Sequence, residues 1–297
     1  MTTIAVIGAN GYIGKHVVEH MRSKDIKVLA ISSQDGSGID PKTGLLPVNF
    51  SFEERLDGVI YAAQSPNYRD IPDLAWHLLT VNSVAPVQAA IAAQKAGARH
   101  FVYLSTGNVY EPGFKAHAEG DAIDGTHWYA FSKIQGEQAL SCMRTQLQIS
   151  TVRVFAVYGP NQFDKLIPNL MERVESGKAI SLASRACGVP DGGLRINPCF
   201  IEDAVDLLTS LACHGGPEIL NLAGSQVISV REVAEMWAKL RGLQPIFLDS
   251  PTPRTLDLIA DTTMLNAYMG KAPCSFEEGL TRMFSQVAQV TPIKASI

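Results

Sequence analysis

Short apolar runs alternate with longer segments of periodic apolar residues over the first half of the chain. The runs are typical of buried strands, whereas apolar residues that recur every three or four positions indicate helices. Their alternation predicts an α/β fold with a doubly wound parallel sheet, because parallel strands must be joined by crossover helices. The predicted strands are 3–7, 27–31, 58–62, 100–104 and 150–155, and the predicted helices are 14–23, 74–96 and 129–144.

The second half has a different pattern. From about residue 166 turn-forming residues become frequent, most of all in the glycine-rich stretch 187–193. An excursion of this kind between helical stretches is typical of a small lobe. Segment 229–240 predicts an amphipathic helix, with Val233 and Trp237 on its apolar face.

The stretch 3–14 brings the first candidate chemistry, because its apolar run leads directly into Gly8, Gly11 and Gly14. Gly8 lets the chain leave the strand, Gly11 lets the backbone approach a pyrophosphate, and Gly14 lets the helix pack on the strand. The helix N-terminus then faces the anion. Glycines also end strands for purely structural reasons, but this position at the start of the chain predicts a dinucleotide-binding Rossmann sheet.

The end of the second predicted strand bears on the choice of dinucleotide. An acidic residue there binds the ribose 2′-hydroxyl of NAD and would repel the 2′-phosphate of NADP. Here Ser32 and Ser33 follow the strand, and the nearest acid, Asp35, comes later in a turn. The two hydroxyls can bind a phosphate, although they can equally open a loop, and no arginine accompanies them. We therefore expect NAD or NADP, with a slight preference for NADP.

Composition excludes several classes of protein. The chain has 297 residues, 46% of them apolar, which is enough for a sizeable core and for about two domains or one domain with a lobe. A net charge of −4 without a basic run indicates neither a nucleic-acid nor a membrane partner. Without a spanning segment or a signal peptide, a cytoplasmic location is expected. Five cysteines without a CxxC pair predict isolated thiols and no metal site.

A second candidate site lies between the fourth predicted strand and the helix that follows. Tyr129 and Lys133 are four residues apart and therefore share one helical face. An ammonium group beside a phenol lowers the phenol pKa from near 10 toward working pH, so that the tyrosine can exchange a proton with a substrate hydroxyl. Thr106, at the strand end, can hold the same hydroxyl. This combination predicts an acid/base site.

With these motifs the chain resembles, almost from end to end, the extended short-chain dehydrogenase/reductases of the NAD-dependent epimerase/dehydratase family. The further elements that carry the resemblance are LDGVIYAA at 56–63, TVN at 80–82, VRVFAVYGP at 152–160, FIEDAV at 200–205, EILNLAG at 218–224 and FEEGL at 276–280.

The resemblance implies an oxidoreductase or isomerase that transfers hydride to and from a nicotinamide cofactor. Residues 1–165, with later segments around 196–212 returning to them, would form the dinucleotide-binding domain. Residues 166–290 would form a substrate lobe, most often for a sugar nucleotide. Tyr129 would be the acid/base, Lys133 would bind the nicotinamide ribose and tune Tyr129, and Thr106 would orient the reacting oxygen. The expected cofactor-binding residues are Gly8, Gly11, Tyr12, Ile13, Gly14, Ser32, Ser33, Ala62, Ala63, Asn82, Ser105 and Lys133, and the expected substrate-binding residues are Thr106, Asn108 and Arg195.

Two departures from the family pattern narrow the reaction. Related 4,6-dehydratases carry an Asp-Glu pair directly after the threonine, whereas Gly107 and Asn108 stand here and cannot do that proton work. We therefore expect an epimerase or a ketoreductase and not a 4,6-dehydratase. The asparagine that binds the substrate diphosphate in relatives is Ala156 here. Arg195 is either a substitute phosphate partner or a solvated loop residue, and a simpler carbohydrate substrate becomes admissible.

A catalytically silent NAD(P)-binding sensor or interaction protein is the alternative from another class. The glycine turn alone would serve a sensor, so the intact Tyr/Lys/Thr set favours the enzyme. A homodimer is expected by family analogy only.

Overall fold

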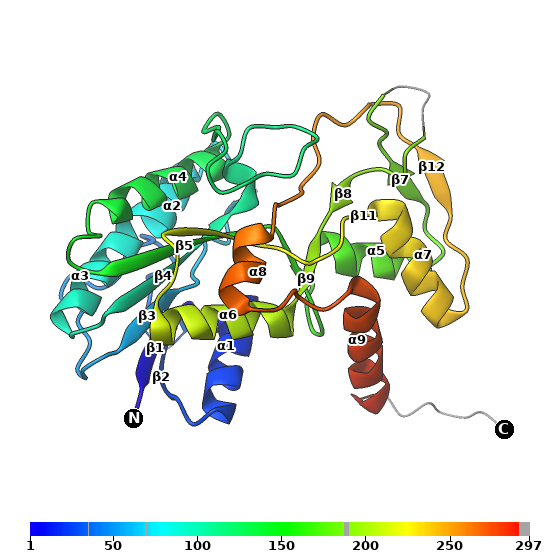
Figure 1. Ribbon diagram of the computed structural model, residues 1–297. Coiled ribbons are helices and arrows are strands. Elements are labelled where there is room, and N and C mark those ends of the chain that lie inside the picture. The colour runs from blue at the N-terminus through cyan, green and yellow to red at the C-terminus, as the bar shows by residue number, and fades with distance from the viewer. Residues whose placement is uncertain (35, 69, 187–189, 291–297) are drawn as a thin grey trace. The chain divides into compact units, whose positions relative to one another are not determined.

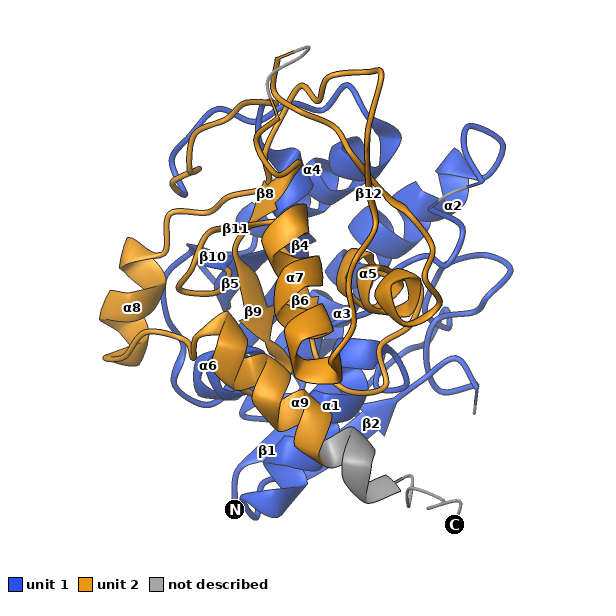
Figure 2. Ribbon diagram, turned by 90° about the vertical axis from the view of Figure 1, so that its right-hand side faces the viewer, with its two compact units in different colours: residues 1–111, 119–154, 204–222 blue, residues 112–118, 155–203, 223–297 orange. Residues whose placement is uncertain are grey.

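The structure is a computed structural model of the 297-residue chain, and it describes all residues except 35, 69, 187–189 and 291–297 (Figure 1). The described chain divides into two compact units, which Figure 2 shows in different colours. Unit 1 comprises residues 1–111, 119–154 and 204–222, and unit 2 comprises residues 112–118, 155–203 and 223–297. Each unit is described by itself below.

Unit 1 is built on a six-stranded parallel sheet with the order β10-β5-β4-β3-β1-β2. The strands, whose bounds follow the predicted ones closely, are β1 (Thr3–Ile7), β2 (Lys27–Ile31), β3 (Gly58–Tyr61), β4 (His100–Thr106), β5 (Gln148–Val154) and β10 (Ile219–Leu222). The chain turns back from β2 across β1 to β3, so the strand order reverses between β1 and β3. Ligands of open α/β sheets bind at such a switch point, outside the carboxyl ends of the strands.

Helices cover both faces of this sheet. They are α1 (Tyr12–Ser23), α2 (Ala75–Leu79), the π-helical turn η1 (Thr80–Val84), α3 (Ala85–Lys95), α4 (Trp128–Ser141) and most of α6 (Ile201–His214). One layer consists of α2, η1, α3 and α4, which contact one another (Figure 1). On the other face α1 and α6 are linked by His20 Nε2 and Asp206 Oδ1, which lie 3.2 Å apart.

The predicted helix 74–96 contains a π-turn that the periodicity did not predict. Pro86 has no N–H group, so it cannot bond the carbonyl of Asn82 four residues earlier. The Tyr103 hydroxyl donates to that carbonyl at 2.6 Å, and the Tyr61 hydroxyl donates to the carbonyl of Val81 at 2.6 Å. Tyrosines of two neighbouring strands therefore replace the missing helical hydrogen bonds, as buried carbonyls require.

The described residues of unit 2 form three two-stranded sheets and four helices. Parallel pairs are β6 (Ala156–Tyr158) with β9 (Pro198–Phe200) and β7 (Ile180–Leu182) with β12 (Phe247–Asp249), and β8 (Arg195–Ile196) pairs antiparallel with β11 (Ile228–Ser229). The helices are α5 (Leu166–Glu175), α7 (Val230–Arg241), α8 (Thr263–Met269) and α9 (Phe276–Val290).

Helix α7 is the amphipathic helix predicted over 229–240. Ser229 and Glu232 form a capping box at its start, with the Glu232 carboxylate 2.7 Å from the Ser229 backbone nitrogen. Its buried face includes Val233 and Trp237 and contacts α5. Within the described part of the chain, no helix combines the length and the apolar character needed to cross a membrane.

Candidate active site

The glycine loop after β1 is packed so tightly that there is no room for a side chain at Gly8 or Gly14. Gly8 has φ of 89°, and a Cβ built on it would lie 2.6 Å from the backbone nitrogen of Ala63. A Cβ on Gly14 would lie 2.2 Å from the Gly8 oxygen, so α1 approaches the loop backbone directly. Both glycines are therefore required by close approach of main chain to main chain.

The N-terminus of α1 fits a pyrophosphate. Gly11 is the N-cap residue, and no side chain of the described residues caps the helix there. The first-turn N–H groups of a helix have no partner within the helix, and together with the helix dipole they favour an anion. Tyr12 and Ile13 begin this turn. Ala62 and Ala63, at the end of β3, lie against Gly8, and Ala62 N donates to Ile7 O at 2.8 Å.

The residues after β2 are arranged as a turn. Ser32 is buried, its hydroxyl accepts from Gln34 N at 3.3 Å, and its carbonyl accepts from Gly38 N at 2.8 Å. Ser33 is exposed. The side chain of Gln34 accepts from Asn10 Nδ2 at 2.8 Å, which ties this turn to the glycine loop. Asp35, the acidic residue nearest to the end of β2, lies outside the described residues.

Asn82 is fully buried in the π-turn. Its Nδ2 donates to the Ser132 hydroxyl at 3.0 Å, while its Oδ1 has no hydrogen-bond partner among the described residues. A Cβ on Gly136 would lie 2.2 Å from the Asn82 carbonyl oxygen, so α4 packs directly on this turn. The contacts of Asn82 therefore fix how α4 packs on the π-turn. A role of Asn82 in cofactor binding stays a prediction.

Tyr129 and Thr106 come from two separate elements and lie near each other. His127 caps α4 by accepting from Tyr129 N at 3.3 Å, so the helix begins at Trp128 and the tyrosine lies in its first turn. The Thr106 hydroxyl lies near the Tyr129 hydroxyl, close enough to act on its pKa. That hydroxyl also donates to Gln64 Oε1 at 3.4 Å. The phenol of α4 thus lies at the carboxyl ends of β3 and β4.

The pKa of Tyr129 differs from the prediction. Burial raises it to about 12, and the nearby Thr106 hydroxyl only partly offsets this effect. The predicted lowering by Lys133 is therefore wrong for the ligand-free protein. The physical reason lies in the position of the lysine: Lys133 Nζ donates to the Leu104 carbonyl at 2.8 Å and lies 5.0 Å from the centre of the Tyr103 ring. Burial lowers the pKa of Lys133 itself to about 7, and the charge of Glu137 acts against this.

The strand end that carries Thr106 contains two further predicted residues. Asn108 is exposed, and its Nδ2 donates to Thr106 Oγ1 at 3.2 Å, so it supports the threonine that would hold the substrate. Ser105 is buried, and its hydroxyl donates to Glu137 Oε1. Its side chain is thus engaged in the interior, and a contact of Ser105 with a cofactor would have to come from its backbone.

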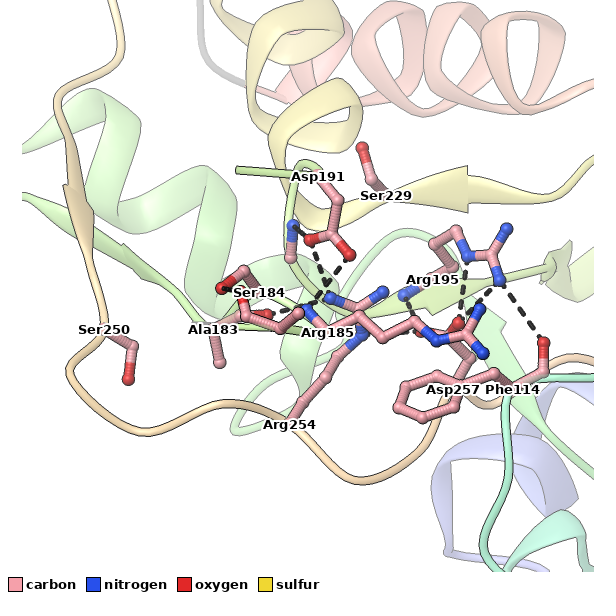
Figure 3. A network of polar contacts seen from close by, with 12 residues as sticks. Phe114, Ala183, Ser184, Arg185, Asp191, Arg195, Ser229, Ser250, Arg254 and Asp257 are labelled. Carbon is pink, nitrogen blue, oxygen red and sulfur yellow. Dashed lines mark hydrogen bonds and ion pairs between the residues drawn. The ribbon is translucent and has the colours of Figure 1, made fainter. Parts of the chain in front are cut away.

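Arg195 belongs to a polar network within unit 2 (Figure 3). Its Nη2 lies 2.8 Å from Oδ2 of the buried Asp257 and 3.3 Å from the Phe114 oxygen. Arg254 binds the same carboxylate and also binds Asp191 at 2.7 Å. Asp257 therefore offsets part of the Arg195 charge, although the Arg195 side chain remains 39% exposed. Contact with a substrate phosphate stays a prediction.

Sequence reasoning missed Gln64 and Glu137. Gln64 follows directly on Ala63, so its place at a strand end was a signal for a residue near the site. Glu137 lies four residues after Lys133, on the same face of α4. A glutamate on a buried helical face requires a cationic partner, and Arg153 in the apolar strand β5 was the candidate.

Comparison with known proteins shows which family carries this set of motifs. The sequence profile described as the NAD dependent epimerase/dehydratase family matches residues 4–223. Relatives include YtcB of Bacillus subtilis, described as an uncharacterized UDP-glucose epimerase, at 24% identity over 97% of this chain and 98% of its own length. A dTDP-4-dehydro-6-deoxy-D-allose reductase of Streptomyces sp. is 25% identical over 86% of this chain and 88% of its own.

Dehydratases also match. The dTDP-D-glucose 4,6-dehydratase of Mus musculus is 26% identical over 72% of this chain and 60% of its own length. Among solved structures, MoeE5 in complex with UDP-glucuronic acid and NAD superposes with a TM-score of 0.76 at 22% identity, covering 98% of this chain and all of that one. At this identity the structural likeness supports the fold.

Proposed function

Because this chain belongs to the NAD-dependent epimerase/dehydratase family, we propose that it is an epimerase or ketoreductase of a sugar nucleotide or related carbohydrate. In this proposal unit 1 holds the dinucleotide and unit 2 contributes to the substrate site. The observation that carries the proposal is that the hydroxyls of Thr106 and Tyr129 lie near each other, at the carboxyl end of β4 and one helical turn from Lys133. A dinucleotide-binding protein without chemistry has no need of this arrangement.

Each residue of the set has a distinct task. The cofactor, when bound, accepts or delivers a hydride at its nicotinamide ring. Tyr129, with a pKa of about 12 in the ligand-free protein, carries its proton at neutral pH and can donate it to a carbonyl oxygen. Thr106 orients that oxygen. In the oxidative direction Tyr129 must accept a proton, and an ammonium at Lys133 favours the phenolate.

The dehydratase reaction is set aside on chemical grounds. Elimination of water needs an additional acid and base, and the two residues after Thr106 are the buried Gly107 and the exposed Asn108. Neither side chain titrates near neutral pH. Relatives of this chain include 4,6-dehydratases, so a dehydratase assay belongs in the substrate panel.

The phosphates of a sugar nucleotide need cationic partners, and unit 2 offers arginines. The Arg185 guanidinium lies 4.2 Å from the centre of the Phe114 ring and is exposed, near Arg195 and Arg254 in Figure 3. Arginine suits this task because its planar group can bind a phosphate with two hydrogen bonds. We propose Arg185 and the exposed part of Arg195 as phosphate contacts. A smaller carbohydrate would leave them unused.

The cofactor should be tested as NADH against NADPH. The family description and the NAD-bound neighbour favour NAD, whereas the absence of an acid directly after β2 was the reason to prefer NADP. Titration of the purified protein with each reduced cofactor, followed by nicotinamide fluorescence, separates the two. A homodimer and a cytoplasmic location also stay predictions.

Turnover is tested with UDP-, dTDP- and GDP-sugars and their 4-keto derivatives. The Tyr129→Phe variant should lose turnover by about 10² to 10⁴-fold and keep cofactor binding, because only the proton donor is removed. Tyr158→Phe is the matched control, since it removes a buried hydroxyl that donates to Phe276 O at 3.2 Å within unit 2. Interconversion without net use of cofactor indicates an epimerase, and stoichiometric use of NAD(P)H indicates a reductase. Tight binding of cofactor without turnover of any sugar would leave the silent sensor.

A further inference from the structure

Glu137 and Arg153 form a buried ion pair between α4 and β5. Arg153 Nη2 lies 2.7 Å from Glu137 Oε2, and Arg153 Nε lies 3.2 Å from Glu137 Oε1. The two side chains are 9% and 4% exposed, respectively. The contact is bidentate, the geometry in which arginine binds a carboxylate most strongly.

The pair is fixed by partners on further elements of unit 1. Ser105 donates its hydroxyl to Glu137 Oε1, so the carboxylate also binds the end of β4. Arg153 Nη1 donates to the Glu119 carbonyl at 3.1 Å, and its guanidinium lies 4.8 Å from the centre of the Tyr110 ring. The carboxylate therefore has three donors from two strands, and its position is tightly defined.

Lys133 lies one helical turn before Glu137 and binds the same strand. Its Nζ donates to the carbonyl of Leu104, the residue before Ser105, and Thr106 follows directly. Two successive turns of α4 thus bind two successive residues of β4. Through these contacts the helix that carries Tyr129 is set against the strand end that carries Thr106.

We propose that Glu137 is a positioning residue of the active site. It fixes α4 to the end of β4, and its carboxylate is the counter-charge that favours the ammonium form of Lys133. The first part rests on the proposed function, because it concerns the Tyr129 and Thr106 pair. The second part concerns the charge state of a buried lysine and can be measured without any turnover.

The electrostatic argument follows from the surroundings of Lys133. Along its own helix it is four residues from both Glu137 and Tyr129. Its Nζ lies 5.0 Å from the centre of the Tyr103 ring of β4, and Arg153 of β5 is bound to Glu137. Both tyrosines are neutral near pH 7, since burial raises the pKa of each. Glu137 is then the anion whose charge acts on Lys133. Without it, burial would hold the pKa of Lys133 below about 7, and the lysine would be neutral at physiological pH.

The test is a pH titration of the Lys133 ¹³Cε NMR resonance in protein labelled at the lysine ε-carbon, assigned by its loss in Lys133→Met. Opposite charges about 6 Å apart at an effective dielectric of about 20 correspond to about two pH units, which the nearby Arg153 reduces. In Glu137→Gln we expect the titration midpoint to fall by at least about one pH unit. A midpoint unchanged to within about 0.3 pH units overturns the proposal.

The matched control is Glu218→Gln, which removes the carboxylate of an exposed Arg144 pair at 2.9 Å in the same unit. It should leave the Lys133 midpoint in place. If Glu137→Gln does not fold because Arg153 is left unpaired, the double variant Glu137→Gln/Arg153→Gln replaces the pair by two amides. The midpoint must fall there as well, because the lysine again loses its nearest anion.

The Ser105→Ala variant separates the effect of the Glu137 charge on Lys133 from the effect of Glu137 on the position of α4. It removes the hydrogen bond to the strand and keeps the carboxylate, so the Lys133 midpoint should stay. Turnover, where the proposed reaction is found, should fall by about tenfold at every pH, whereas Glu137→Gln should also shift the pH profile of kcat/KM. A profile that is unchanged in Glu137→Gln refutes the role in the site. If no reaction is found at all, the proposed function fails. The NMR titration still shows whether Glu137 acts on the charge of Lys133.

Discussion

The charge of Lys133 has a consequence for stability that can be measured without a substrate. Its pKa is lowered by burial from 10.5 to about 7, although Glu137 acts in the opposite direction. Between these two pH values the unfolded chain keeps the lysine proton and the folded chain releases it. The unfolded state then binds more protons, so the free energy of unfolding rises with pH over this interval. Below about pH 7 both states are protonated, and the contribution no longer changes.

The magnitude follows from the two pKa values. Each pH unit corresponds to about 1.4 kcal/mol, so the full interval amounts to about 5 kcal/mol, and the range from pH 7 to 9.5 to about 3 kcal/mol. Lys133→Met removes the titrating group and keeps a side chain of similar length. The stability of the wild-type chain relative to this variant should therefore increase by about 3 kcal/mol over that range.

The assay is urea unfolding at four pH values, followed by intrinsic fluorescence, to which Trp76 and Trp128 of unit 1 contribute. Other titrating groups act on both proteins alike and cancel in the difference. The lost hydrogen bond to Leu104 O adds a constant that does not depend on pH. If the difference in unfolding free energy between the wild-type chain and Lys133→Met changes by less than about 0.5 kcal/mol over this pH range, the folded lysine keeps its proton. The electrostatic reasoning for this site would then be refuted.

Two further predictions concern the packing around the site. Gly14→Ala should abolish dinucleotide binding and lower stability, because its Cβ would lie 2.2 Å from the Gly8 oxygen. Gly120→Ala, with nothing within 4 Å of the added atom, should do neither. Titration of both variants with NADH and NADPH checks this. Tyr103→Phe leaves the buried Asn82 carbonyl without its 2.6 Å donor and should cost about 1 to 3 kcal/mol in urea unfolding; an unchanged midpoint would mean that water or a neighbouring group replaces the hydroxyl.

Burial affects the two groups of the proposed site differently. Tyr129 keeps its ordinary neutral form at pH 7, because its pKa is raised to about 12, whereas the pKa of Lys133 is lowered to about 7. A positive charge near Tyr129 would favour its phenolate.

The sequence by itself determined the sheet, the glycine loop and the spacing of Tyr129 and Lys133. These features are local: strand periodicity, the absence of a Cβ and a separation of four residues along a helix can be read within short windows. Pro86 was also visible, although its consequence for the helix depends on the two tyrosines that lie on neighbouring strands.

Only the tertiary structure decided how the side chains are used. It brought Thr106 to Tyr129, turned Ser105 inward to Glu137 and engaged Arg195 with Asp257. It also reversed the predicted direction of the Tyr129 pKa shift, because desolvation depends on everything that surrounds a group and outweighs the effect of a charge one turn away. Partners of this kind are separated by tens of residues along the chain. Their pairing is set by packing, which no short window of sequence contains.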